Sequence, residues 1–303
     1  MTAFWSFYDL IPITLAQSLI YAFVALGIML PFRILNFPDM TAEGAFPLGG
    51  SICAAFLASG LSPMVGMAVA AVGGALAGAS TAIIHLRFRI NSLLAGILVM
   101  TMLYSLNLHI LGRPNVALFK YPTLFNSIAY FGPGSLAGKI VVLSLLVATV
   151  FFLLLYLLLT ERGVGVRAAG SNPEMAEAYG VSVGSITVAG VATAGACSAF
   201  GGSLLVQSQG FVDVGMGIGV LVNGLASLII GESLLGRRRV INQLAAPVVG
   251  SILYPQMVSV CLAIGLPPSD LRFATGLLVL VALALPILRK RGTAPAMREK
   301  VRA

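Results

Sequence analysis

Charged residues are scarce in this chain. Only 9% of its 303 residues are Asp, Glu, Lys or Arg, whereas 58% are hydrophobic, and the mean hydropathy is +1.00. A soluble domain carries about 25% charged residues, so this chain has too few to cover a globule of its size with a hydrated surface. A water-soluble fold is therefore excluded, and the apolar excess indicates a protein that faces membrane lipid.

Cysteine and histidine are also scarce, which excludes several kinds of site. Cys53, Cys197 and Cys261 lie inside apolar runs and form no CxxC pair, so neither a disulfide framework nor a zinc site is expected. His85 and His109 lie near the ends of apolar runs, and no HExxH motif or Ser-His-Asp set is legible. We therefore expect no catalytic and no metal-binding residue in this chain.

A nucleotide-binding loop is missing as well. Gly138-Lys139 is followed by Ile140 and lacks the leading glycine of a GxxxxGKS or GxxxxGKT loop, and Gly215-Met-Gly-Ile-Gly219 does not fit GxGxxG. The chain should therefore bind no nucleotide phosphate in that manner and hold no cofactor of its own. Any ATP hydrolysis that it uses would come from a partner.

The net charge of +8 reflects basic residues gathered between the apolar runs. The clusters are Arg87 with Arg89, Arg162 with Arg167, the run 237–239 and the tail 289–302. This placement is typical of loops held on the cytoplasmic side of a membrane. No basic stretch alternates with aromatic residues on a soluble module, so nucleic acid is not an expected partner.

Long apolar runs predict an all-α fold, a polytopic transmembrane helix bundle embedded in membrane lipid. A spanning helix needs about 20 apolar residues, and nine segments qualify. They are residues 10–32, 42–60, 63–85, 91–111, 139–159, 183–206, 216–235, 242–264 and 272–288. A broken or re-entrant helix near residues 33–46 would change the count to eight or ten.

The basic residues also predict the orientation of the bundle. With the N-terminus outside, the inside segments hold 14 of the 18 Lys and Arg residues and the outside segments hold 4. Because positive residues accumulate on the cytoplasmic side, we expect a multi-pass protein of the cytoplasmic (inner) membrane, with its N-terminus outside and its C-terminus in the cytoplasm.

Polar residues interrupt the hydrophobic region around residues 33–46. Asn36, Asp39 and Glu43 surround Pro38, which lacks an N–H and breaks a continuous helix. One interpretation is a loop followed by a helix that Asp39 or Thr41 caps. The other is a discontinuous helix that lines a solute path, because ionisable residues inside a membrane are costly and often functional.

Four further polar residues lie in or beside apolar spans. Asn91, Asn107 and Asn223 could form hydrogen bonds between helices or line a translocation path. Asp213 belongs to Phe211-Val-Asp213, which resembles Phe37-Pro-Asp39 and suggests an internal repeat. The candidate path residues are therefore Asn36, Asp39, Glu43, Asn91, Asn107, Asp213 and Asn223.

The most polar part of the chain is the inside loop at residues 161–182. Asn172 and Pro173 fit the N-cap and first position of a short helix, although Ser171 and Glu174 form an alternative capping box. Gly180 is a natural terminator. A helix of about two turns is marginal alone in water, so we expect it to pack against something, either this chain or a cytoplasmic partner.

This loop resembles a known element. The run Arg167-Ala-Ala-Gly170-Ser-Asn172-Pro-Glu174-Met-Ala176-Glu-Ala-Tyr-Gly180 resembles the cytoplasmic coupling loop of ABC importer permeases in the branched-chain amino-acid and ribose permease superfamily. Tyr21–Gly27, Leu35–Phe37, Glu43-Gly44 and Gly49 look like the first block of that superfamily. Asn36–Phe46, Asn91–Asn107 and Gly112–Asn115 look like the tryptophan/tyrosine-type permeases, and the similarity runs from about residue 15 to 290.

The resemblance implies a permease subunit of an ABC importer for an amino acid or related compound. Residues 1–290 would form the transmembrane permease domain, and residues 291–303 a basic cytoplasmic tail. Two permease copies, an ATPase subunit holding ATP and magnesium, and an extracytoplasmic substrate-binding protein would assemble. By position, the contact with the ATPase would be made by Arg167, Ala168, Gly170, Asn172, Glu174, Ala176 and Gly180.

Two other functions stay open at this point. Asp39 and Glu43 could carry a proton or cation in a secondary transporter that needs no ATPase. A membrane scaffold without transport is the third class. Asp39 and Glu43 also give the chain more negative charge than the branched-chain permeases show, so a cationic group on the ligand is possible.

Overall fold

The structure is a computed structural model. It describes residues 2–127, 136–237 and 239–263, together with positions 265, 267, 270, 273, 275–277 and 280. Within this part of the chain nearly all regular structure is helical, which confirms the predicted all-α class. The predicted ninth span at 272–288 and the basic tail at 291–303 lie largely or wholly outside the described residues.

Long helices make up most of the described chain, and short elements join them. The long helices are α1 (Thr2–Met29), α2 (Thr41–Ala58), α3 (Pro63–Phe88), α4 (Ser92–Leu111), α6 (Leu136–Leu159), α9 (Val183–Gln209), α10 (Val220–Leu235) and α11 (Val240–Ala263). The short elements are the π-helix η1 (Leu30–Ile34), β1 (Asn115–Ala117), α5 (Leu124–Ser127), α7 (Glu161–Ser171), α8 (Pro173–Ala178), β2 (Phe211–Asp213) and the 3-10 helix η3 (Val214–Gly217).

Seven segments among the described residues are long and apolar enough to cross a membrane. They are Leu10–Ile34, Pro63–Phe88, Ser92–Leu111, Leu136–Leu159, Val183–Gln209, Val214–Leu235 and Val240–Ala263. Each matches a predicted span within a few residues. The predicted span 42–60 forms helix α2. This helix is not among the seven candidate membrane spans, because Glu43, Pro47 and several small residues lower its mean hydropathy. The count of nine is therefore not confirmed.

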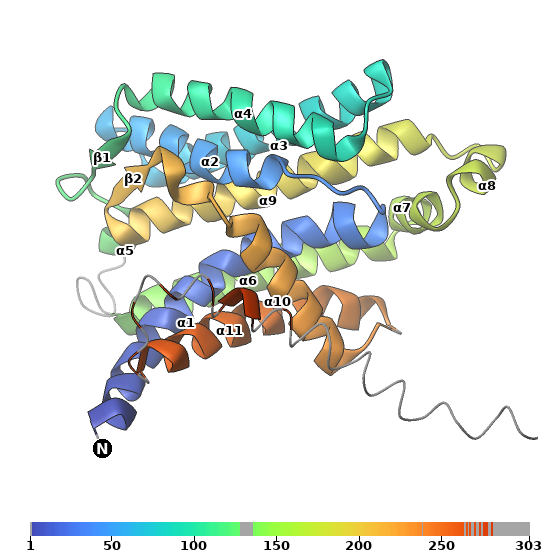
Figure 1. Cartoon of the computed structure of the whole chain (residues 1–303). Coiled ribbons are helices and arrows are strands. Elements are labelled where there is room, and N and C mark those ends of the chain that lie inside the picture. The colour runs from blue at the N-terminus through green and yellow to red at the C-terminus, as the bar shows by residue number, and fades with distance from the viewer. Residues whose placement is uncertain are drawn as a thin grey trace, which may run out of the picture.

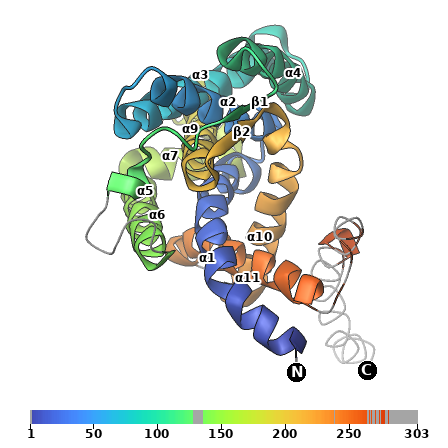
Figure 2. The same cartoon turned by 90° about the vertical axis from the view of Figure 1, so that its left-hand side faces the viewer.

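The bundle has two distinct ends (Figure 1). Helices α7 and α8 lie at one end. The N-terminus, α5 and the two strands lie at the other, where β1 and β2 pair antiparallel with Val116 opposite Val212. Viewed along its length, the bundle places α3 and α4 on one side and α11 on the opposite side, with α1 between them (Figure 2). The N-terminus is thus at the end opposite the segment predicted to be cytoplasmic.

Two helices begin partway along the bundle rather than at an end, namely α2 and α10 (Figure 1). Before α2, the chain leaves η1 and runs through Leu35–Met40 without helical structure. The amides of Leu35 and Phe37 donate to the carbonyls of Leu30 and Pro31, at 3.0 and 2.8 Å. These bonds satisfy backbone groups that a break inside lipid would otherwise leave unpaired.

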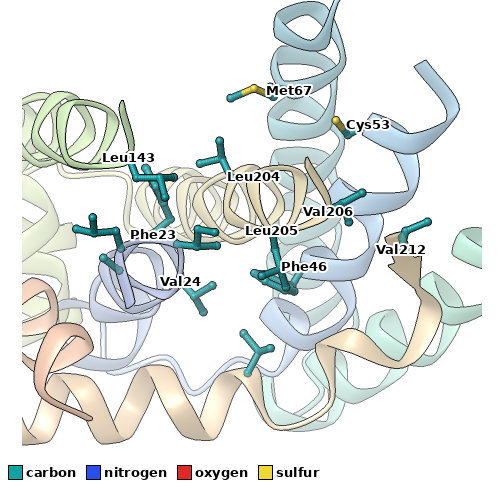
Figure 3. Packing of buried hydrophobic residues seen from close by; sticks show 14 of the residues in the cluster. Phe23, Val24, Phe46, Cys53, Met67, Leu143, Leu204, Leu205, Val206 and Val212 are labelled. Atoms are coloured by element: carbon teal, nitrogen blue, oxygen red, sulfur yellow. The ribbon is translucent and has the colours of Figure 1, made fainter. Parts of the chain in front are cut away.

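Helix α9 forms the centre of the core. Figure 3 shows Leu204, Leu205 and Val206 of α9 among side chains from α1, α2, α3 and α6, including Phe23, Phe46 and Leu143, all of which are buried. Its small residues meet neighbouring backbones directly. A Cβ at Gly195 would overlap the Gly74 carbonyl of α3, and one at Gly202 would overlap the Phe46 carbonyl of α2. Small residues at helix contacts allow this approach in lipid.

Gly195→Ala should destabilise the protein, because the added methyl group meets the α3 backbone, which cannot move aside as a flexible side chain would. Overpacking of this kind costs about 1–3 kcal/mol. The matched control is Gly184→Ala on the same helix, where the new Cβ would meet only a Leu86 methyl group at 3.6 Å. Thermal unfolding in detergent should show a lower midpoint for Gly195→Ala only, and equal midpoints would contradict the tight contact.

Candidate coupling segment and translocation path

The polar segment at residues 161–180 folds as two consecutive helices. The expected short helix is present as α8, and its N-cap is Asn172, whose Oδ1 accepts a hydrogen bond from the amide of Met175 at 3.0 Å. Pro173 occupies the first position, and Gly180 follows with a φ of +82°. The capping box of Ser171 and Glu174 is not formed. Residues 161–171, expected as loop, are the helix α7 instead.

Helix α7 forms despite its three glycines because close packing requires them. A Cβ at Gly163 would overlap the backbone of Leu158, and one at Gly170 would overlap the carbonyl of Ile34. Val166 and Ala169 are buried beside them. In the sequence, this segment is polar and rich in glycine, a pattern typical of a loop. The contacts with α6 and η1 stabilise it as a helix instead.

The proposed coupling residues differ in exposure. Asn172, Glu174 and Gly180 are exposed, Arg167 and Ala168 are half-buried, and Gly170 and Ala176 are buried. The exposed apolar surface of α8 comes from Met175, which is 54% exposed, and from Tyr179 beyond its end, which is 77% exposed. A hollow of about 300 Å³ lies beside them, lined by Ala168, Ser171, Asn172, Met175, Ala176, Tyr179 and Val181.

Asn36 connects this segment to the break between α1 and α2. Its Nδ2 donates to the carbonyl of Gly170 at 2.9 Å, across 134 residues of sequence. Asn36 has a φ of +51°, a left-handed conformation that asparagine tolerates better than most residues. The two segments singled out from the sequence, the interruption near residue 36 and the polar loop, are therefore in direct contact.

Asp39 lies at the entry to α2 and is buried. Its Oδ1 accepts from the backbone amide and the hydroxyl of Thr41, and that hydroxyl also bonds to the hydroxyl of Thr81 on α3. Gly96 of α4 packs against it, since a Cβ there would lie 2.8 Å from Asp39 Oδ1. Asp39 therefore stabilises a helix start that follows a break inside the bundle. Its role in lining a solute path stays a prediction.

Glu43, in the first turn of α2, reaches the beginning of α10. Its Oε1 accepts from the amide of Gly219 at 3.2 Å, although the two residues are far apart in sequence. The η3 element also packs here, because a Cβ on Gly217 would overlap the carbonyl of Glu43. The structure thus brings together the starts of the two helices that begin inside the bundle.

Asn107 of α4 is fully buried beside them. Its Nδ2 donates to the carbonyl of Gly44 on α2 at 3.4 Å, and its Oδ1 has no hydrogen-bond partner. The expected hydrogen bond between helices is thus present for Asn107.

Asn223 lies apart from this group, on a larger cavity. The cavity has a volume of about 490 Å³ and lies between α1, α10 and α11. Its polar lining consists of Thr14, Gln17, Tyr21, Asn223, Ser227, Tyr254, Ser259 and Thr275. No charged side chain is among the described residues that line it.

The two remaining candidates lie at the ends of the bundle. Asn91 is exposed and caps α4, accepting from the amide of Leu93 at 2.9 Å. Asp213 accepts from the amide of Gly215 at 2.6 Å and lies near Asn115 at the β1–β2 end. Asp213 is therefore the N-cap of η3. Asp39 likewise accepts from the amide two residues on, but the N-cap of α2 is Met40. The structure does not gather either residue with Glu43, Asn107 or Asn223.

Glu232 is a buried acid that was not among the residues predicted from the sequence. This acid on α10 is 6% exposed and forms ion pairs with Arg33 and Arg237, both at 2.6 Å. The pairs connect the end of α10 to η1 and to the turn before α11. Glu232 could have been predicted from the sequence, because it is an acid inside the apolar run 216–235, where ionisable residues are often functional.

Comparisons with known proteins identify the family of this chain. A family described as "Branched-chain amino acid transport system / permease component" matches residues 10–284. The tyrosine transport system permease protein of Clostridioides difficile (strain R20291) is 39% identical over 273 residues, covering 89% of each chain. An uncharacterized protein of Rickettsia prowazekii (strain Madrid E) is 30% identical over 274 residues, covering 89% of this chain and 95% of its own.

No solved structure matches the chain significantly. The family match covers nine-tenths of the sequence and includes α7, α8 and the break before α2. The chain therefore belongs to the branched-chain amino acid transport system permease family.

Proposed function

We propose that this chain is the permease subunit of an ABC importer that moves an amino acid or related compound across the cytoplasmic membrane. Hydrolysis of ATP with magnesium takes place in a separate ATPase subunit, a second permease copy completes the path, and an extracytoplasmic binding protein delivers the solute. The matching family consists of components of transport systems, which implies further subunits. The tyrosine permease relative supports an amino-acid-like solute.

One observation carries the proposal, namely an apolar surface presented at one end of a membrane bundle on short polar helices. Met175 and Tyr179 are exposed at that end, and no lipid-spanning segment includes them. With α7 and α8 in the cytoplasm, the N-terminus is outside, as the distribution of basic residues also favours. A secondary transporter would not need this surface, and a family of transport-system components supports the ABC alternative.

The ATPase should bind through Met175 and Tyr179. Exposed aromatic and methionine side chains are frequent anchors in interfaces, and losing one anchor costs about 2 kcal/mol or more. In mild detergent, the amount of ATPase bound to the double variant Met175→Ala/Tyr179→Ala should therefore be at least tenfold lower than the amount bound to the wild type. The measurement is the amount of a co-purifying subunit that carries a GxxxxGKS or GxxxxGKT loop and hydrolyses ATP.

Phe88→Ala is the control for this experiment. Phe88 is 70% exposed and is the last residue of α3. Its substitution therefore removes an exposed aromatic side chain that lies outside α7 and α8. It should retain the ATPase at the wild-type level. If wild type binds no ATPase, the ABC assignment is wrong; if the double variant binds as wild type does, the docking surface is elsewhere.

Asn36 should transmit movement of α7 to the start of α2, through its bond to Gly170. Asn36→Gly removes that bond and keeps a residue that tolerates a positive φ. A hydrogen bond contributes about 0.5–1.5 kcal/mol, so the solute imported per ATP hydrolysed should fall about two- to tenfold. The ATPase should stay bound.

The control is Asn242→Ala, which removes another bond from an asparagine amide to a backbone carbonyl, that of Leu235 at 3.0 Å. In Asn242→Ala, the amount of solute imported per ATP hydrolysed should remain at the wild-type value. Uptake and hydrolysis are measured together in proteoliposomes with the binding protein present. An unchanged ratio in Asn36→Gly would rule out transmission through this contact.

The solute path includes the cavity between α1, α10 and α11. Its volume of about 490 Å³ suits an amino acid, and its neutral polar lining would bind a zwitterion weakly enough to release it. Asn223→Phe should fill the cavity and abolish most solute uptake while leaving ATPase binding intact. Leu234→Phe, at an exposed position of the same helix outside this lining, should transport normally. Normal uptake by Asn223→Phe would place the path elsewhere.

A further inference from the structure

Glu43 is an acid within the helix bundle that forms no ion pair with any residue that the structure describes. Both ion pairs found in the described part of the chain involve Glu232, and neither involves Glu43. Glu43 lies in the first turn of α2, which begins partway along the bundle. A carboxylate at such a position is costly and commonly serves a ligand, an ion or a proton.

A small cavity lies next to this carboxylate. Its volume is about 50 Å³, and it is lined by residues of α2 (Glu43, Gly44 and Pro47), α4 (Met100, Tyr104 and Asn107) and the η3 region (Val214, Gly215, Gly217 and Ile218). This is more than the 10–15 Å³ or so that one water molecule requires. It can therefore hold a group of the size of an ammonium, but not an entire amino acid.

The polar atoms at this cavity favour a donor group. Asn107 is fully buried, and its Oδ1 is an acceptor without a partner. Its Nδ2 is directed to the Gly44 carbonyl. Together with the Glu43 carboxylate, the cavity offers one full negative charge and one unused carbonyl oxygen. An ammonium group, with three donors and one positive charge, complements this set.

The position of the cavity links it to the proposed path. Ile218 lines both this cavity and the larger cavity between α1, α10 and α11. Ile218 is 70% exposed and Tyr104 is 55% exposed, so the small cavity opens toward the surface of the protomer. The two cavities are therefore neighbours at Ile218, and a solute that moves from the larger cavity past Ile218 would reach the cavity that Glu43 lines.

We infer that Glu43 and Asn107 bind the ammonium group of the transported solute, at the point where α2 and α10 both begin. This inference rests on the proposed function for the identity of the solute, but the binding of an ammonium group can be measured without it. Discontinuous helices that begin near the middle of a membrane form solute sites in other transporters. Helix N-termini in such sites favour anionic groups, but here the Glu43 carboxylate already accepts from the start of α10. An incoming group therefore meets that carboxylate, which favours the cationic end of a zwitterion.

The alternative is that Glu43 only stabilises the start of α10 through its bond to the Gly219 amide. Glu43→Gln separates the two roles. Glutamine keeps a side-chain oxygen that can accept from Gly219 but has no charge. Loss of a capping bond would lower the unfolding midpoint equally in every salt, whereas loss of ammonium binding would remove only the shift that methylammonium causes.

The first experiment uses the purified full-length chain in detergent. Its thermal unfolding midpoint is compared in methylammonium chloride, sodium chloride and choline chloride at equal ionic strength. A ligand at about five times its dissociation constant stabilises the folded protein by mass action, and for a large domain this corresponds to a rise of about 2–4 °C in the midpoint. We expect this rise with methylammonium and not with choline, which is too large for the cavity.

Asp39→Asn is the matched control, because Asp39 is an acid near the start of the same helix that accepts a hydrogen bond through its Oδ1 but does not line this cavity. The methylammonium shift should persist in Asp39→Asn and disappear in Glu43→Gln and Asn107→Leu. No shift in wild type, a shift with sodium alone, or a full shift in Glu43→Gln would each overturn the inference. The midpoint in choline reports whether each variant is folded.

A second measurement tests the inference in the working complex. With L-tyrosine as the probe in proteoliposomes, Glu43→Gln should lower uptake at least tenfold while the amount of bound ATPase is unchanged. The ammonium-free analogue 3-(4-hydroxyphenyl)propionate should not compete with uptake by wild type. Competition by that analogue as strong as by tyrosine would overturn the inference, whereas loss of the bound ATPase in wild type would refute only the proposed function.

Discussion

A break in a helix inside lipid requires partners for its backbone polar groups, and the site depends on how this chain supplies them. The π-helix η1 lets the amides of Leu35 and Phe37 bond back to Leu30 and Pro31. Asp39 then stabilises the first turn of α2. Because water is absent from the membrane core, each of these bonds is required before α2 can begin inside the bundle.

The same break places functional groups where a continuous helix could not. Asn36 projects to the end of the bundle and contacts Gly170, whereas Glu43, seven residues later, meets Gly219 at the start of α10. One short segment therefore joins helices α7 and α8 to the start of α10 inside the bundle. An uninterrupted helix would bury its backbone groups in its own hydrogen bonds and would leave no such connection.

Much of this fold can be predicted from the sequence, because lipid imposes strong rules on length and hydropathy. Seven spans, the cap at Asn172 and the interruption at Pro38 follow from local patterns. Helix α7 does not, since its glycines resemble a loop until Ile34 and Leu158 are seen against them. The contacts of Asn36 with Gly170 and of Glu43 with Gly219 are also invisible, because they join residues more than a hundred positions apart.

The small residues of α9 have a consequence for assembly. Glycine and alanine lose no side-chain rotamer freedom on burial, and α9 presents Gly190, Gly195, Gly201 and Gly202 to its neighbours. Lipid tails are as apolar as leucine, so hydrophobic burial contributes little to helix association there. At these glycines α9 therefore loses no side-chain entropy on packing, and close contact between backbones adds dispersion to the packing of its buried Leu204, Leu205 and Val206.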